Sequence, residues 1–330
     1  MRALVSIRPG GPQTLAVADL SPPTPGPGQV LISVRSCGVN FPDTLIIEDR
    51  YQFKPERPFA PGGEVAGVVE DIGNAVTGIQ IGDRVIGTAL WGGMAEKFVC
   101  DEHRCVKIPD TMPFDDAAAL LLTFGTSYYA LKDRAHLKPG ETVIVLGAAG
   151  GIGLSSVSLA KAMGARVIAA VSTEQKAAVA LEAGANEAVI YGRDQSAAHQ
   201  RRFTESLKQS TGPNGADVIV DAVGGTYAEA ALRAIGWNGR FLVVGFPAGI
   251  PTIPLNLALL KSCQIIGVFW GAWIDREPSA FQKSAAELID LYSQSKIKPE
   301  ISARYALRDS AMAFEQLAER RAIGKLVVMI

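Results

Sequence analysis

The sequence predicts an α/β protein with two domains, one of them built on a doubly wound parallel sheet. Its 330 residues suffice for two domains. Between Glu141 and Val171 a strand, a glycine-rich turn, a helix and a second strand follow one another, as in a βαβ unit. Apolar runs then alternate with helical segments as far as residue 268, which is typical of a parallel sheet covered by helices.

The glycine-rich turn follows the buried, β-branched run Thr142–Leu146. It keeps the G-x-G-x-x-G spacing with Ala148 first, then Gly150 and Gly153. A small first residue allows the tight turn, the second position lets the backbone approach a pyrophosphate, and the third lets the helix pack on the strand. The N-terminus of the helix predicted over Leu154–Met163 would face the phosphates. The turn therefore predicts a dinucleotide site; the alternative is a glycine-rich turn without a ligand.

The choice of cofactor is predicted from the end of the second strand, Arg166–Val171. An NAD site usually has a carboxylate there for the ribose 2′-OH, but this strand ends in Ser172 and Thr173. Ser172 and Gln175 predict a capping box that opens a helix, with Lys176 in its first turn. A hydroxyl, backbone N–H groups and a lysine suit a 2′-phosphate, so the prediction is NADPH. The alternative is that Lys176 is an ordinary solvated lysine.

The remaining chain is organised around these elements. The first 120 residues contain short strands separated by Gly-Asp and Gly-Gly turns, which predict a small barrel. After residue 272 two amphipathic helices, 279–293 and 308–320, precede a final strand over 325–330, and this tail is expected to complete the first domain. The strands predicted for the parallel sheet are 142–146, 166–171, 188–191, 216–221, 240–245 and 264–268.

Composition excludes several function classes. The 32 basic and 33 acidic residues nearly balance, so neither nucleic acid nor an anionic membrane is expected as a partner. The four cysteines form no disulfide framework, and the N-terminal segment lacks the apolar core of a signal peptide. The longest apolar run, Val143–Leu154, is too short to span a bilayer. We expect a cytoplasmic protein with a small-molecule substrate.

Further motifs point to a known family. They are Gly38-Val39-Asn40-Phe41-Pro42-Asp43, Pro61-Gly62-Gly63-Glu64-Val65-Ala66-Gly67, Gly82-Asp83-Arg84-Val85, Gly125-Thr126-Ser127-Tyr128-Tyr129 and Gly324-Lys325. With the glycine-rich turn they resemble the medium-chain dehydrogenase/reductase superfamily, in its zinc-free NADPH:quinone oxidoreductase (zeta-crystallin-like) branch. The resemblance implies a GroES-like β-barrel catalytic domain over 1–121, an NADPH-binding Rossmann domain over 122–267 and a return to the catalytic domain over 268–330.

The same resemblance argues against a metal. In the zinc alcohol dehydrogenases a cysteine stands in place of Asn40 and a histidine in place of Gly63, and neither residue present here can hold zinc. Residues 86–96 also lack the cysteines of a structural zinc lobe. Cys100, His103 and Cys105 are possible ligands, but the strand-like alternation around them does not direct all three to one point, so no metal is predicted.

The resemblance also implies the site residues. Asn40, Tyr51 and Tyr129 would contact the substrate carbonyl, where neutral donors can stabilise an oxyanion without a metal. Asp43 is expected to orient a neighbour or close a turn rather than act as an acid. The residues expected to bind the cofactor are Asn40, Thr126, Ala149, Gly150, Gly151, Ile152, Ser172, Lys176, Tyr191, Val223, Gly245, Phe246, Phe269, Trp270 and Lys325. For Phe269 and Trp270 the alternative is core packing.

The predicted function is zinc-independent transfer of hydride from NADPH to quinones or α,β-unsaturated carbonyls. One alternative is an enoyl-thioester reductase, for which Arg50, Lys54 and Arg57 could form a basic rim; another is a non-catalytic NADPH-binding protein. The apolar sixth strand, Gln264–Val268, is expected at a sheet edge. Both that edge and the resemblance predict a homodimer. The alternative is that the chain's own C-terminal helix covers the edge.

Overall fold

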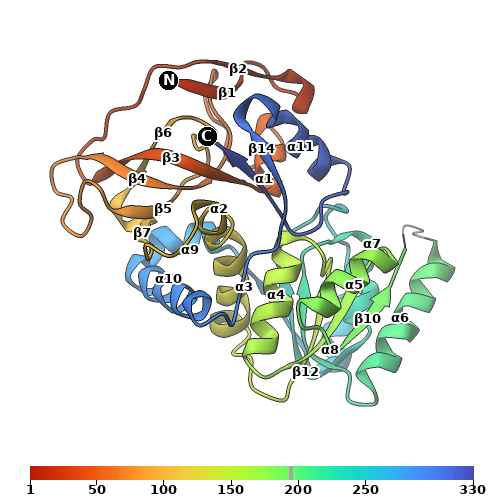
Figure 1. Cartoon of the computed structure of the whole chain (residues 1–330). Helices are drawn as coiled ribbons and strands as arrows, with labels where there is room; N and C mark the ends of the chain where they lie inside the picture. The colour runs from red at the N-terminus through yellow and green to blue at the C-terminus, as the bar shows by residue number, and fades with distance from the viewer. Residues whose placement is uncertain (193–195) are drawn as a thin grey trace. The chain divides into compact units, whose positions relative to one another are not determined.

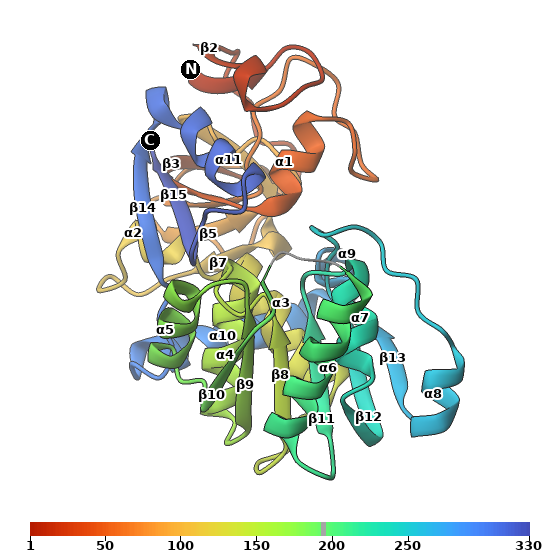
Figure 2. The same cartoon turned by 90° about the vertical axis from the view of Figure 1, so that its right-hand side faces the viewer.

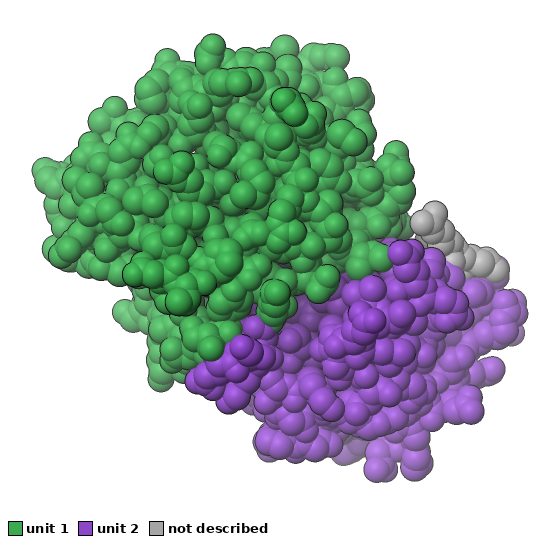
Figure 3. Space-filling model, in the orientation of Figure 1, with its two compact units in different colours: residues 1–122, 271–293, 298–330 green, residues 123–270, 294–297 purple. Residues whose placement is uncertain are grey.

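The computed structural model describes residues 1–192 and 196–330 (Figure 1). The chain divides into two compact units (Figure 3). Unit 1 comprises Met1–Leu122, Gly271–Ser293 and Lys298–Ile330, and unit 2 comprises Thr123–Trp270 and Gln294–Ile297. The catalytic role expected for residues 1–121 and 268–330 and the cofactor-binding role expected for residues 122–267 stay predictions.

Unit 2 contains the predicted doubly wound sheet. Its six parallel strands hydrogen-bond in the order β10-β9-β8-β11-β12-β13 (Figure 2). Successive strands are added on one side of β8 as far as β10 and on its other side from β11 onward, so the strand order reverses between β8 and β11. The strands are β8 (Thr142–Leu146), β9 (Arg166–Val171), β10 (Glu187–Ile190), β11 (Ala216–Asp221), β12 (Ile235–Val243) and β13 (Gln264–Gly267). Strand β12 begins at Ile235 rather than at the predicted residue 240, because a register shift between Ala216 and Val218 lets the earlier residues pair.

Helices connect these strands. They are α4 (Gly151–Ala162), α5 (Glu174–Glu182), α6 (Ala197–Thr211), α7 (Gly225–Leu232) and α8 (Asn256–Lys261). Before β8 the chain forms a continuous helical run made of η3 (Leu121–Gly125), α3 (Thr126–Tyr128) and η4 (Tyr129–Arg134), of which η3 and η4 are π-helical. The core lies between sheet and helices, on fully buried residues such as Ile144, Ile168, Ile219 and Phe241.

The capping box predicted at Ser172 is wrong by one residue. Helix α5 begins at Glu174, and its N-cap is Thr173, whose Oγ1 accepts a hydrogen bond from the Lys176 N–H at 3.3 Å. Two adjacent hydroxyl residues offer the same capping group, and the extended backbone of Thr173 decides between them.

Unit 1 is built mainly on antiparallel strands; the exception among the described pairs is β14, which pairs with β15 in parallel. Its main sheet has the order β14-β15-β3-β4-β5-β7, with β6 pairing on β3, and a separate hairpin joins β1 to β2. The strands are β1 (Arg2–Ser6), β2 (Leu15–Asp19), β3 (Gln29–Val39), β4 (Glu64–Ile72), β5 (Arg84–Thr88), β6 (Lys97–Asp101), β7 (Cys105–Lys107), β14 (Ile301–Ala306) and β15 (Lys325–Met329). Antiparallel pairing of β15 with β3 brings the last strand of the chain beside the motif that begins at Gly38.

Most of the helices that accompany these strands are short, and α10 is the long one. They are η1 (Pro12–Thr14), α1 (Phe41–Ile47), η2 (Glu102–Arg104), α2 (Phe114–Ala117), α9 (Trp270–Arg276), α10 (Pro278–Ser293), η5 (Leu307–Asp309) and α11 (Ala311–Ala318). The helix predicted over 308–320 is shorter than expected and divided in two. Ser310 separates η5 from α11, and the left-handed φ of 57° at Arg320 prevents the helix from continuing to that residue. Within the described residues, no helix is long and apolar enough to cross a membrane.

Candidate active site

The glycine-rich turn of unit 2, residues 147–153, joins β8 to α4. Gly147 has a φ of +68°, which favours glycine, and its carbonyl accepts a hydrogen bond from the Gly150 N–H at 3.0 Å. Gly150 is the N-cap of α4 and provides no side-chain cap. The N–H groups of the first turn of α4 are therefore available to an anion, together with the partial positive charge of the helix.

Gly150 and Gly153 of the turn have different surroundings. A Cβ placed on Gly153 would lie 2.1 Å from the Gly147 carbonyl oxygen and 2.6 Å from the Cα of Ala148. A Cβ on Gly150 would meet only the Gly147 oxygen, at 3.5 Å. Gly153 is thus required for packing within the protein, whereas Gly150 leaves its outer side open. This open backbone fits the close approach of a pyrophosphate.

The end of β9 has the polar groups expected beside a 2′-phosphate. Ser172 and Lys176 are both partly buried, and the first carboxylate after the strand, that of Glu174, is exposed. The assignment of Ser172 and Lys176 to the cofactor stays a prediction.

The loops after β11 and β12 are joined by backbone hydrogen bonds. The Val223 carbonyl accepts from the Ala248 N–H at 2.8 Å, and the Gly225 N–H donates to the Gly249 carbonyl at 2.7 Å. The predicted cofactor residues Val223, Gly245 and Phe246 therefore lie in one pair of loops. They follow the carboxyl ends of adjacent parallel strands, where open α/β sheets bind ligands.

Asp221 organises these loops, and sequence reasoning missed it. Its Oδ1 accepts hydrogen bonds from the N–H groups of Val223 at 2.9 Å and Gly224 at 2.8 Å. The side chain is 1% exposed, and its Oδ2 has no hydrogen-bond partner among the described residues. Burial raises the pKa of Asp221 to about 6. An aspartate at a strand end followed by Val-Gly-Gly is the signal that could have indicated it.

Three buried serines fix the segment that carries Thr126 and Tyr129. The Ser127 hydroxyl lies 2.7 Å from that of Ser155 and 2.9 Å from that of Ser156. All three are at most 1% exposed. These bonds connect the helical run after residue 121 to the helix that follows the glycine-rich turn, so Thr126 and Tyr129 are held in a defined position relative to that turn. In the sequence, the only sign of these hydrogen bonds was the presence of small hydroxyl residues at core positions of α4.

The aromatic residues predicted to contact the cofactor divide into two groups. Trp270 is 6% exposed and packs on Gly125, where a Cβ would lie 2.6 Å from the indole ring. The Tyr191 ring lies 4.6 Å from that of Tyr227, within the core. Phe246 and Phe269 are instead 41% and 48% exposed. Core packing therefore accounts for Trp270 and Tyr191, and a role at the cofactor stays a prediction for all four.

Unit 1 contains a buried polar cluster, formed by Asn40, Asp43, Glu64 and Lys325. Each of the four residues is less than 5% exposed. The Lys325 ammonium donates to Asn40 Oδ1 at 2.6 Å and to Glu64 Oε2 at 3.1 Å. Asn40 Nδ2 donates to Glu64 Oε2 at 3.3 Å, and the Asn40 N–H donates to Asp43 Oδ2 at 2.8 Å. The cluster therefore holds one cation, two acids and an amide in contact.

The local structure explains how these residues meet. Asn40 is the N-cap of α1, which places Asp43 in the first helical turn. The pairing of Leu326 with Val39 brings Lys325 to the same end of β3. A Cβ on Gly38 would lie 2.1 Å from the Ala118 carbonyl oxygen and 3.1 Å from Lys325 Nζ, so this glycine makes room for the ammonium. The sequence motifs included all these positions but gave no sign of the pairing between Glu64 and Lys325.

Burial changes the acid–base properties around the cluster. Burial raises the pKa of Asp43 to about 7, against the opposing effects of the Asn40 N–H and Lys325. Burial, with Asp43 and Glu64 nearby, also holds the pKa of the Cys37 thiol well above its usual range, so the thiol stays neutral. Tyr51, which is partly buried, has its pKa raised by burial and by Asp43. Asp43 can therefore change its protonation state near neutral pH.

The possible zinc ligands Cys100, His103 and Cys105 do not converge. The His103 ring nitrogen Nε2 lies 3.1 Å from Asp275 Oδ1, while both cysteines are buried on β6 and β7. Over residues 1–192 and 196–330, no group of three or more His, Cys, Asp or Glu side chains could hold a metal ion.

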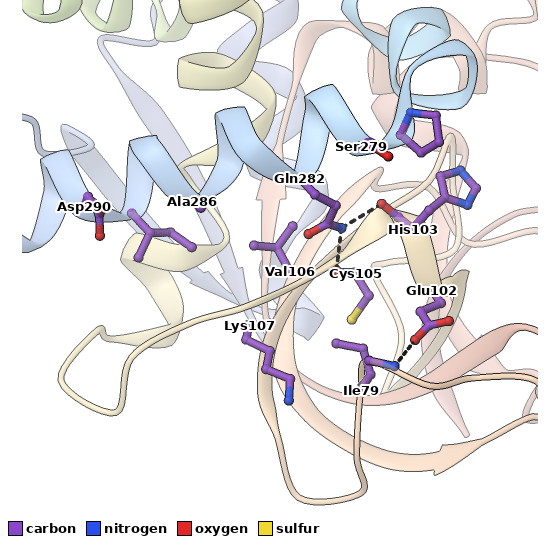
Figure 4. A pocket seen from close by; sticks show the side chains of 13 residues that line it. Ile79, Glu102, His103, Cys105, Val106, Lys107, Ser279, Gln282, Ala286 and Asp290 are labelled. Atoms are coloured by element: carbon purple, nitrogen blue, oxygen red, sulfur yellow. Dashed lines mark hydrogen bonds between the residues drawn. The ribbon is translucent and has the colours of Figure 1, made fainter.

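A separate pocket of about 790 Å³ lies in unit 1 beside α10 (Figure 4). In it Gln282 Nε2 donates to the carbonyls of His103 at 2.9 Å and Cys105 at 3.0 Å. None of the residues predicted to bind substrate or cofactor lines this pocket, so it is not the candidate active site.

Comparisons with known proteins agree with this geometry. Residues 26–110 match the alcohol dehydrogenase GroES-like domain, and residues 151–290 match the zinc-binding dehydrogenase family. A quinone oxidoreductase-like protein 2 homolog of Nematostella vectensis is 40% identical over 92% of this chain and 82% of its own length. The human quinone oxidoreductase is 32% identical over 100% of this chain and 98% of its own. The crystal structure of Escherichia coli quinone oxidoreductase complexed with NADPH is 29% identical, covers 100% of both chains and has a TM-score of 0.91. The chain belongs to the quinone oxidoreductase family of the medium-chain dehydrogenase/reductase superfamily.

Proposed function

We propose that the protein is an NADPH-dependent reductase that transfers hydride to quinones or α,β-unsaturated carbonyls. The observation that carries the proposal is the glycine-rich turn, where Gly150 leaves an open approach to the uncapped N-terminus of α4. The absence of a carboxylate at the end of β9 favours NADPH over NADH. The Escherichia coli relative complexed with NADPH supports the same choice.

The bound nicotinamide would supply the hydride. The chain's own residues would bind and orient both reactants and stabilise the negative charge that moves to the substrate oxygen. Asn40 is suited to that role because Lys325 occupies its amide oxygen, so that Nδ2 is the group of this side chain that can donate to the substrate oxygen. The bonds that Nδ2 makes, 3.3 Å to Glu64 and 3.4 Å to the Gly38 carbonyl, are long and can be exchanged for a substrate oxygen. Tyr51 and Tyr129 are proposed as further donors.

A substrate panel tests this function. Quinones, alkenals and acyl-CoA enones are each mixed with the protein and NADPH, and the loss of NADPH absorbance is followed, with NADH in a parallel series. We expect turnover of quinones or alkenals and a preference for NADPH. Tight NADPH binding without turnover of any electrophile would instead identify a non-catalytic binding protein.

The enoyl-thioester alternative has little support in the structure. Two of the three basic residues expected to form a rim are engaged in ion pairs, Arg50 with Glu48 at 2.9 Å and Arg57 with Asp49 at 2.8 Å. Within the described residues, Lys54 alone of this set forms no ion pair, and one lysine is a weak site for a CoA phosphate. The acyl-CoA arm of the panel measures this alternative directly.

We propose that the reaction needs no metal and that the protein is cytoplasmic. Asn40 is engaged with Lys325 and Glu64, and Gly63 has no side chain to act as a ligand. Elemental analysis of the purified protein should find much less than one zinc per chain, and a chelator should leave turnover unchanged. One zinc per chain with chelator-sensitive activity would refute the proposal.

We also propose a homodimer formed through β13. This strand is an edge of the six-stranded sheet, and its Ile265 is 39% exposed. In the same unit, Leu255, Leu259 and Leu260 at or within α8 are between 65% and 79% exposed. Pairing β13 with the same strand of a second copy would cover these apolar groups. Light scattering should give twice the chain mass of 34.9 kDa, and a mass near that of one chain would exclude the dimer.

A further inference from the structure

The polar cluster of unit 1 has an unbalanced charge. Lys325 contributes one positive charge, and Glu64 and Asp43 contribute one negative charge each when both are ionised. Glu64 is paired with Lys325 at 3.1 Å, and its Oε1 accepts from the Leu122 N–H at 2.8 Å. Asp43 is 2% exposed, and the hydrogen bonds it receives come from uncharged backbone N–H groups, those of Asn40 and Gly62. The excess negative charge of the cluster is therefore located on Asp43.

We propose that Asp43 is an electrostatic positioning residue whose protonated form is the active one. The inference rests on the proposed function, because it concerns the substrate oxygen that Asn40 would contact. When hydride adds to the electrophilic carbon, the π-electron pair of the substrate moves to its oxygen, and a proton from solvent later neutralises that oxygen. An ionised Asp43 one hydrogen bond from Asn40 opposes this new negative charge, while a protonated Asp43 leaves the cluster neutral.

The groups that face Asp43 decide its protonation state. Burial and Glu64 on β4 favour the protonated acid. The Asn40 N–H, Lys325 on β15 and the Gly62 N–H favour the carboxylate. Cys37 on β3 and Tyr51 beyond α1 also interact with Asp43, and both stay neutral because their pKa values are raised. These effects balance near pH 7, so below that pH Asp43 holds a proton and above it the cluster gains a negative charge.

The test compares the wild type with Asp43→Asn, which keeps an oxygen to accept from the Asn40 N–H but is always neutral. For the wild type, kcat should fall by roughly tenfold per pH unit above the Asp43 pKa. The rate of Asp43→Asn should be flat in the same range. Glu48→Gln is the matched control, because it removes a carboxylate at the C-terminal end of the same helix and should retain the wild-type profile.

A second measurement does not depend on turnover. NMR of the full-length protein carrying 13Cγ-labelled aspartate should show a carboxyl that titrates near pH 7 and is absent from Asp43→Asn, whereas the Asp221 carboxyl, with its pKa of about 6, should be present in both proteins. An Asp43 signal that is ionised throughout pH 5–9, or identical pH profiles for the wild type and Asp43→Asn, would overturn the inference. Absence of turnover on every electrophile would instead refute the proposed function and leave the NMR result to decide on the charge of Asp43.

Discussion

The glycine-rich turn of unit 2 takes its chemistry from the backbone of consecutive residues, whereas the polar cluster of unit 1 takes it from side chains at positions 40, 43, 64 and 325. In the turn, the donors are the first N–H groups of α4, which have no acceptor within the helix and need no partner within the protein. In the cluster, each buried charge depends on another residue. A backbone site should therefore tolerate most side-chain changes except those that fill its space, while a side-chain site should fail when one member is removed.

The largest effect should come from breaking the cluster. Lys325→Met would leave the Glu64 carboxylate buried without its cation, and removal of one partner of a buried pair costs about 3–5 kcal/mol. Urea unfolding should show this loss in the free energy of unfolding. Adding Glu64→Gln should restore part of it, since the uncompensated charge is then gone.

A surface pair provides the control for this change. Lys97 and Glu70 form an ion pair whose side chains are 26% and 43% exposed, so Lys97→Met should cost no more than about 1 kcal/mol. If Lys97→Met and Lys325→Met destabilised the protein equally, the buried pair would have no special importance.

The turn should be broken by filling the space inside it. Gly153→Ala would place a Cβ 2.1 Å from the Gly147 carbonyl oxygen, which is backbone and cannot move without disturbing the turn. We expect a loss of about 1–3 kcal/mol in the free energy of unfolding, although alanine is otherwise the better helix former. A Gly153→Ala variant as stable as the wild type would contradict this account of the packing.

Gly150→Ala should separate binding from stability. Its Cβ would meet only the Gly147 oxygen at 3.5 Å, so the free energy of unfolding should change by less than about 0.5 kcal/mol. The methyl group would stand where a pyrophosphate must approach, and loss of a hydrogen bond to a charged phosphate costs about 1.5–3 kcal/mol. Isothermal titration with NADPH measures this loss, and unchanged affinity would place the phosphates elsewhere.

The smallest effect on binding should come from a single, partly buried side chain after β9. Lys176→Ala should weaken NADPH binding by about 1–3 kcal/mol, because a charge-assisted hydrogen bond to the 2′-phosphate is lost. NADH binding should stay unchanged. Lys208→Ala, an exposed lysine near the end of α6, serves as the control. Equal affinities of the unmodified protein for NADPH and NADH would refute the assignment.

Much of unit 2 could be predicted because its signals are local. The bounds of β8, β9 and β11 agree with the prediction, since each is a short apolar run that ends at a glycine or polar residue. The different roles of Gly150 and Gly153 also follow from their spacing, and their surroundings agree with those roles. Where two neighbours offered the same cap, at Ser172 and Thr173, the local signal did not suffice and the backbone conformation chose Thr173.

The polar cluster and the hydrogen bonds among Ser127, Ser155 and Ser156 were decided by the tertiary structure. Positions 40, 64 and 325 each belong to a recognisable motif, but the pairing of β15 with β3 is what brings Lys325 to Glu64 and Asn40. The pKa of Asp43 likewise depends on burial and on these distant charges. By itself the sequence determined the fold class and the nucleotide-binding turn, because backbone conformation and hydrophobic pattern are properties of neighbouring residues. The contacts and charge states of buried side chains depend on residues far apart in the chain, so only the folded structure determines them.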